Sequence, residues 1–245
     1  MTEEKRLPIT QHFTEMRQRF LRSILGIVAG TIIALFFGFQ IIEILKVPAG
    51  QFADKLVAIQ MLEMFSLYFR VALTAGFIIA MPWILYQFFA FLMPAFTAKE
   101  KRFIFTFFPF IIVMFIAGVA FAYFVAMPPA IQFLFGFGAD TVDVIPRISD
   151  YIDVVLRLLV GIGLVFELPI ILTALSAVGI VSSKWLASKR KIWFVLAFII
   201  AAFITPTFDP LNQTIVAGPL IVLYELSIWL TKIIRKRKPN VPAVT

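Results

Sequence analysis

One carboxylate interrupts a long apolar stretch in the second half of the chain. Nine uncharged residues separate Glu167 from Arg157, so Glu167 lies about 15 Å further along a helix and deep in a bilayer. A charged side chain is expensive there, so such residues usually face a cavity or a partner. We favour a functional role in a water-accessible concavity, with a structural hydrogen bond to a neighbouring helix as the alternative. Pro169 cannot donate an amide to the Val165 carbonyl, so we also expect a helix kink.

A second carboxylate lies among arginines near the N-terminus. Apolar residues recur there at spacings of four, three and four, which predicts an amphipathic helix over about residues 7–20 that lies at the membrane surface. These residues are Ile9, Phe13, Met16 and Phe20. His12, Glu15 and Arg19 share another face of that helix. Spacing alone favours a solvated face with ordinary ion pairing over a binding site.

Two further groups of polar residues fit cap and turn chemistry. Thr97 and Glu100 have the spacing of a capping box, in which each side chain bonds to the backbone amide of the other residue. Capping is the favoured interpretation, although a carboxylate in a first helical turn can also bind a ligand. Asp209 and Gln213 flank a tight turn after Thr205, where turn chemistry alone explains an aspartate.

Two residue pairs at helical spacing predict packing contacts. Gly26 and Gly30 would let another helix approach closely, either within the bundle or from a partner. Asp153 and Arg157 have the spacing of an intrahelical ion pair, for which a structural role is the better interpretation.

The residues of hydrolases and metalloproteins are missing from the sequence. It has no cysteine and a single histidine, His12, so thiolate and histidine metal sites are not expected. The Gly-rich lysine loop of nucleotide hydrolases is absent as well. We therefore expect no metal, no cofactor and no enzymatic activity. The formal net charge of +8 is placed beside apolar segments, which favours control of membrane topology over binding of nucleic acid.

The composition is that of a membrane protein. Hydrophobic residues make up 61% of the 245 residues and charged residues 15%, against roughly a half and a quarter in soluble domains. A crossing needs about 20 apolar residues, and a helix satisfies its own backbone in lipid. The sequence therefore predicts an all-α integral membrane protein with six transmembrane helices. They are expected at about residues 20–42, 68–93, 103–127, 151–179, 192–204 and 215–231.

Loops and helix lengths predict the shape and the domain organisation. The last two predicted helices are shorter than a full crossing, which predicts local thinning of the bilayer around them. The expected bundle is concave and cup-like. External loops are expected at residues 43–65 and 128–149. Residues 1–235 are predicted to form one transmembrane domain, and residues 236–245 a tail.

Basic residues predict the orientation. About 17 lysines and arginines fall on the side of both termini, whereas Lys46, Lys55 and Arg147 fall opposite. Because lysine and arginine are enriched on the cytoplasmic side, we expect both termini and the tail in the cytoplasm.

Five blocks of sequence occur in an order shared with a known family. They are HFTEMRQR (residues 12–19), PWILYQFFAFLMPAFTAKEKR (82–102), FAYFV (121–125), FELP (166–169) and TPTFDPLNQ (205–213). In this order they resemble the TatC family, the multispanning subunit of the twin-arginine protein translocase, over nearly the whole chain apart from its extreme tails. Phe13 and Met16 replace the usual leucines and Lys101 replaces an arginine, whereas the carboxylates are retained.

The resemblance implies a receptor that binds the twin-arginine signal peptide of folded cargo and organises export driven by the proton gradient. Glu15 and Glu100 would contact the consecutive arginines, with Arg17 and Arg19 in the same binding region. A guanidinium presents a planar fork of donors that a carboxylate can accept in two bonds, whereas lysine offers a point charge. We therefore expect this site to prefer arginine.

A second set of polar residues, Glu167, Asp209 and Gln213, is expected inside the membrane or in the transport step. Implied partners are signal peptides, single-span subunits of the TatA and TatB type, the lipid bilayer and a possible second copy of the chain, all at the cytoplasmic (inner) membrane.

Two other functions fit the residues without the resemblance. A proton-coupled transporter of small solutes would use Glu167 as its relay and the arginines for topology alone. The apparent lack of internal repeats argues mildly against such a transporter. A membrane insertase or passive scaffold ranks last.

Overall fold

The structure is a computed structural model in which residues 9–95, 98–137, 141, 145–177, 179–206 and 209–236 are described. Within these ranges the regular elements are helical, and one isolated bridge joins Val57 to Arg147. The prediction of an all-α protein is confirmed.

The first half of the chain forms long helices joined at one side by a helical loop. Its elements are α1 (Ile9–Phe36), α2 (Gly38–Lys46), a 3-10 segment (Val47–Lys55), α3 (Glu63–Leu92), a short 3-10 turn (Met93–Ala95), α4 (Ala98–Phe121), a π-helical segment (Ala122–Ala126) and α5 (Met127–Gly136). The second half contains α6 (Ile148–Val165), α7 (Leu168–Ala177), α8 (Ser183–Ser188), α9 (Arg190–Ile204) and α10 (Pro210–Lys236).

Five helical stretches of the described residues are long and apolar enough to cross a membrane. They are Phe13–Phe36, Glu63–Leu92, Phe108–Gly136, Ile148–Ala177 and Pro210–Ile233. The chain is therefore a multi-pass membrane protein. With 15 residues, α9 is about 22 Å long, short of the roughly 30 Å hydrocarbon core. A sixth crossing, through α9, remains a prediction.

Helix α10 corrects the expectation that the last helix is short. It has 27 residues. The prediction of residues 215–231 followed the apolar part alone, whereas the helix continues through polar residues at both ends. Asp209 supports the early start, since its two carboxylate oxygens accept the amides of Leu211 and Asn212 over 2.9 and 3.1 Å. Of the two helices predicted to be short, only α9 is short.

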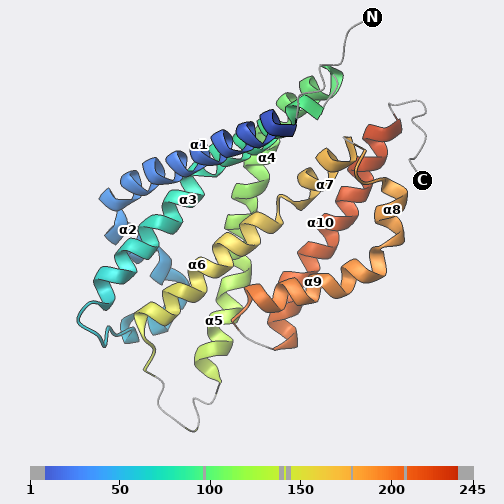
Figure 1. Cartoon of the computed structure of the whole chain (residues 1–245). Coiled ribbons are helices and arrows are strands. Elements are labelled where there is room, and N and C mark those ends of the chain that lie inside the picture. The colour runs from blue at the N-terminus through green and yellow to red at the C-terminus, as the bar shows by residue number, and fades with distance from the viewer. Residues whose placement is uncertain are drawn as a thin grey trace, which may run out of the picture.

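The helices form a bundle with two distinct ends (Figure 1). The first turns of α1 and the last turns of α10 lie at one end, which we call the terminal end. The opposite end, called the loop end, carries α2 and the starts of α3 and α6. Along the bundle α1 packs on α3, α4 on α6, and α10 on α7 and α9. The core is apolar and includes Leu67, Ile152 and Leu220, each at most 1% exposed.

The amphipathic segment predicted at the membrane surface is the beginning of α1. This helix runs without a break, because residues 9–36 contain no proline and its two glycines, Gly26 and Gly30, are tolerated where lipid excludes water. Phe13 and Phe20 are 63% and 66% exposed, so this face of α1 points away from the bundle.

Close helix contact at the two glycines of α1 is confirmed. A Cβ atom added to Gly30 would lie 2.5 Å from the carbonyl oxygen of Gly76 in α3, and one added to Gly26 would lie 2.5 Å from Cδ1 of Trp83. Both contacts are internal to the bundle. The small residues therefore set the distance between α1 and α3.

The loop predicted at residues 128–149 begins later in the structure. Pro128 and Pro129 occupy the first turn of α5, where a missing amide is tolerated, and the helix continues to Gly136. The preceding π-helical segment, Ala122–Ala126, absorbs the change in hydrogen bonding. The expected loop at residues 128–149 is correspondingly shorter.

Glu63 joins the two connections at the loop end. Its Oε2 accepts the amides of Ile59 and Gln60 over 2.8 and 3.1 Å, and its Oε1 accepts the amide of Ser149 over 3.3 Å. Nη2 of Arg147 lies 3.5 Å from Oε2. The residues on either side of Arg147, Pro146 and Ile148, form backbone hydrogen bonds with Val57. One carboxylate thus links the start of α3 to the start of α6.

Asp153 does not form the expected ion pair with Arg157. It accepts instead from Nη1 of Arg70 in α3, over 2.6 Å to Oδ1. A partner on an adjacent helix replaced the one predicted from spacing within a single helix. Arg157 is exposed.

Candidate functional site

Three side chains from two helices meet near the terminal end: Glu15 and Arg19 of α1, and Gln87 of α3. We call them the Glu15 cluster. Nε and Nη2 of Arg19 donate to Oε1 of Glu15 over 2.9 and 2.6 Å. Nη1 of Arg19 donates over 3.5 Å to the side-chain oxygen of Gln87, which is 3% exposed. The Glu15 side chain remains 26% exposed, so this carboxylate holds a guanidinium and is also open to a ligand.

The α1–α3 contact beside this cluster is fixed by Trp83. Its Nε1 donates to the carbonyl oxygen of Arg22 over 3.0 Å, and its ring stacks on Tyr86 with centroids 5.6 Å apart. Because Gly26 packs directly on the same ring, α1 has little freedom to slide along α3. The position of Glu15 is therefore set by packing two to three turns further along α1.

The other residues predicted for signal binding are placed less completely. Glu100 is the third residue of α4, but its side chain and Thr97 lie outside the described residues, so the capping-box prediction is not tested. Arg17 is exposed on α1. Among the described residues it forms no ion pair, whereas Arg19 does.

Glu167 lies where the fourth span breaks, between α6 and α7. Its amide bonds to the Leu164 carbonyl, and its own carbonyl accepts the amides of Ile170 and Ile171. The predicted kink at Pro169 is confirmed, because α6 ends at Val165, the residue whose carbonyl the proline cannot satisfy.

The carboxylate of Glu167 is enclosed and not on an open surface. The residue is 1% exposed, which contradicts the expectation of a water-accessible concavity. Neither of its oxygens has a hydrogen-bond partner in the described part of the chain. The hydroxyls of Thr173 in α7 and Thr231 in α10 are likewise buried without a partner among the same residues. A buried polar group without a partner is costly, so a hydrogen bond from an incoming donor to Glu167 would be strongly favourable.

The structure does not bring Asp209 and Gln213 to Glu167. Asp209 caps α10 at the loop end, which confirms the turn chemistry expected there. Gln213, one turn later, is partly exposed. Glu167 lies at the α6–α7 break, and the hydrogen bonds recorded for the described residues do not join it to either side chain.

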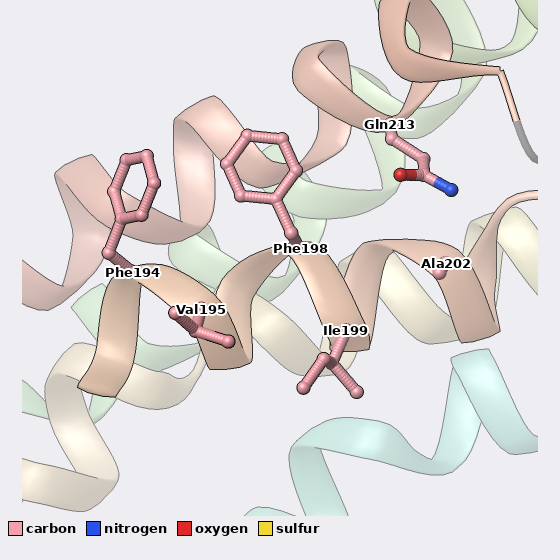
Figure 2. A pocket seen from close by; sticks show the side chains of 6 residues that line it. All are labelled: Phe194, Val195, Phe198, Ile199, Ala202 and Gln213. Carbon is pink, nitrogen blue, oxygen red and sulfur yellow. The ribbon is translucent and has the colours of Figure 1, made fainter. Parts of the chain in front are cut away.

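Gln213 is the polar member of an apolar groove on the outside of α9. The groove has a volume of about 450 Å³, and Figure 2 shows the Gln213 amide beside the row of α9 side chains. The lining residues are Phe194, Val195, Phe198, Ile199, Ala202 and Gln213. A polar side chain at the edge of an apolar surface can bond to a polar group of a helix packed there.

At the terminal end α9 is tied to α10 by an ion pair and a ring stack. Arg190 donates to the two oxygens of Glu225 over 2.6 and 3.0 Å. The rings of Trp193 and Tyr224 stack with centroids 4.7 Å apart. Glu225 is therefore paired across the two helices, and α9, which carries most of the groove residues, is held against α10.

Sequence reasoning missed two polar residues. Gln87 lies within a run of aromatic and apolar residues and was not singled out. A single amide in a membrane helix is rarely left without a partner, and this rule could have identified it. Glu63 was assigned to a loop, although an acidic residue just before an apolar helix is typical of a helix N-terminus.

Comparison with known proteins decides the family. The family model described as Sec-independent protein translocase protein (TatC) matches residues 11–219. The chain belongs to the TatC family.

Two members of the TatC family show how complete the similarity is. The chain is 38% identical to the Sec-independent protein translocase protein TatC of Aquifex aeolicus over 242 residues, covering 96% of this chain and 99% of that one. It is 36% identical to the TatC protein of Carboxydothermus hydrogenoformans over 236 residues, with 96% and 97% covered. The recognition made from five sequence blocks is confirmed.

Solved TatC structures share the fold. Two crystal structures of the twin-arginine translocase receptor TatC, one of them in the detergent DDM, superpose with TM-scores of 0.77 and 0.80 at 38% identity. They cover 91% and 90% of this chain and 98% and 99% of the solved chains. The protein is thus a component of a Sec-independent protein translocase, and the comparisons give no support to the small-solute transporter.

Proposed function

We propose that this protein is the receptor that binds the twin-arginine signal peptide of folded cargo, with Glu15 as a direct contact for one of the two arginines. The observation that supports this proposal is the geometry of the Glu15 carboxylate, which accepts two bonds from a guanidinium and is still partly exposed. A site that already fits one arginine side chain has the shape and charge for another.

Glu100 is proposed as the contact for the second arginine. It lies in the first turn of α4, at the terminal end, where the N-terminal partial charge of that helix favours an anionic side chain. Each charge-assisted bond to an arginine contributes about 1.5–3 kcal/mol. Two such contacts would select a signal peptide and still permit its release.

The proposed orientation puts the terminal end in the cytoplasm. Exposed basic residues there include Arg17, Arg22, Lys184 and Arg190, and such residues favour the cytoplasmic side. A signal peptide at the front of a newly made protein reaches the membrane from the same side. We place the protein in the cytoplasmic (inner) membrane with both termini inside.

Single-span subunits of the TatA and TatB type are the proposed partners, and we assign one of them to the groove on α9. The groove is apolar along α9 from Phe194 to Ala202 and offers one amide, Gln213. An apolar transmembrane helix that carries one polar group matches that surface in polarity. The same translocase would use the proton gradient to move folded cargo, with Glu167 acting after signal binding.

The test of receptor function is binding of a twin-arginine peptide to the purified protein in detergent. We expect Glu15→Gln to weaken binding about tenfold or more, in keeping with the loss of a charge-assisted bond. Replacing the two arginines of the peptide by lysines should weaken binding to the unaltered protein by a similar factor. Unchanged affinity in both experiments would refute the proposal.

A further inference from the structure

Arg19 uses all three nitrogens of its guanidinium within the Glu15 cluster. Nε and Nη2 both donate to the same oxygen, Oε1 of Glu15, over 2.9 and 2.6 Å. Nη1 points to the oxygen of Gln87 on the neighbouring helix at 3.5 Å, a longer and weaker contact. The guanidinium is therefore held mainly by Glu15 and has a second acceptor within reach.

An incoming arginine cannot take its best geometry while Arg19 stays in place. A guanidinium binds a carboxylate most strongly as a fork, with one parallel bond to each of the two oxygens. In the structure one of those oxygens, Oε1, already accepts two donors. The full fork is available only after Arg19 leaves that oxygen.

Gln87 supplies the place to which Arg19 can move. Its side chain is 3% exposed, so an arginine that turns toward it meets an acceptor that water does not occupy. The amide is neutral, so this second position is weaker than the ion pair and leaves Arg19 on Glu15 in the absence of a ligand.

We propose that Arg19 is a resident occupant of the Glu15 carboxylate, and that an arginine of the signal peptide displaces it toward Gln87 on α3. This inference rests on the proposed receptor function and adds a positioning residue that sets specificity. An arginine side chain recovers the cost of displacement by forming the fork, whereas a lysine, as a point charge, cannot. Displacement would also bring the Arg19 side chain closer to α3 whenever a peptide is bound.

The experiment measures peptide affinity in variants of the purified full-length protein. Arg19→Gln removes the occupant and keeps a hydrogen-bonding side chain, and we expect the twin-arginine peptide to bind roughly two- to fivefold more tightly, in keeping with the modest strength of a partly exposed ion pair. Arg22→Gln is the charge-matched control. Arg22 is exposed one turn further along α1 and forms no ion pair among the described residues, so this variant should change affinity by less than twofold.

Gln87→Leu tests where Arg19 goes. It removes the second acceptor and should weaken peptide binding when Arg19 is present, but not in the double variant with Arg19→Gln. Such coupling is what a double-mutant cycle measures. Unfolding temperatures of all variants separate folding defects from binding defects. If either single variant loses stability, peptide affinity can still be measured in the double variant.

Two outcomes would overturn the inference. One is equal tightening by Arg19→Gln and Arg22→Gln, which would mean that only overall charge matters. The other is weaker binding by Arg19→Gln, which would make Arg19 a direct contact for the peptide. Failure of the receptor proposal looks different, because Glu15→Gln would then leave peptide affinity unchanged whatever residue stands at position 19.

Discussion

Gly30 of α1 faces Gly76 of α3 so closely that a Cβ atom on Gly30 would meet the Gly76 carbonyl oxygen at 2.5 Å. Neither backbone can move aside easily, because Trp83 holds the same two helices a few residues away.

Gly30→Ala should therefore separate α1 from α3 and lower the free energy of unfolding by about 1–3 kcal/mol, the usual cost of overpacking. Thermal unfolding of the purified protein in detergent measures the loss. Gly218→Ala is the matched control, because a Cβ atom there meets no atom within 4 Å. Equal stability of both variants would show that the contact between Gly30 and Gly76 is not tight.

Glu63 should be the acidic residue at the loop end on which stability depends most. Glu63→Ala leaves three amides and Arg147 without their acceptor, and polar groups left without a partner are destabilising, so the unfolding temperature should fall markedly. Glu43→Ala is the control, since Glu43 is exposed and bonds only to Lys46 among the described residues, a pair worth under about 1 kcal/mol. Comparable unfolding temperatures for the two variants would contradict this role.

Glu167 should be needed for export and not for signal binding. Glu167→Gln keeps the shape and hydrogen-bonding capacity of the side chain, and Glu167→Ala removes both. We expect both variants to fold and to bind the twin-arginine peptide while export of folded cargo falls. A purely structural side chain would behave differently, with Gln preserving export and Ala lowering stability. Normal export in both variants would eliminate a transport role.

Gln213 should contribute to holding a single-span partner in the groove on α9. Gln213→Leu makes the groove uniformly apolar, and loss of one interhelical hydrogen bond in lipid costs about 0.6–2 kcal/mol. We expect about 3- to 30-fold less partner recovered with the purified variant in mild detergent. Leu211→Ala, at an exposed position on the same turn outside the groove, should leave recovery unchanged. Equal recovery with both variants would argue against the groove.

The orientation of the bundle can be tested with single cysteines, because the chain has none of its own. Lys184 at the terminal end and Lys55 at the loop end are both exposed. A membrane-impermeant thiol reagent added to intact cells should label Lys55→Cys and spare Lys184→Cys, and permeabilised cells should label both. The reverse pattern would place the terminal end outside.

Local chemistry was predictable from the sequence wherever one residue type determines it. Pro169 broke the fourth span at the expected place, and the glycines of α1 marked a close helix contact. Asp209 capped a helix as its turn position indicated. The proline break and the aspartate cap have causes within a few residues of their effects, whereas the glycines marked a contact surface without identifying its partner, α3.

Contacts between helices were not predictable in the same way. Asp153 was given the partner nearest in sequence, Arg157, but the folded chain offers it Arg70. Gln87 and Glu167 are both polar and buried in apolar helices, but the amide of Gln87 meets an arginine from α1, whereas the carboxylate of Glu167 meets no donor among the described residues. Spacing within one helix cannot decide which face of it another helix will cover.

The peripheral position of α1 has a consequence for the order in which the protein assembles. Only 11% of the most apolar stretch of α1 is buried, and its packing is mostly against α3. The two helices are the first two long helices of the chain, separated by residues 37–62, so their docking requires nothing that is synthesised later. A helical hairpin of α1 and α3 can therefore form in the membrane while the ribosome is still making the second half of the chain, and the remaining helices then join a scaffold that already exists.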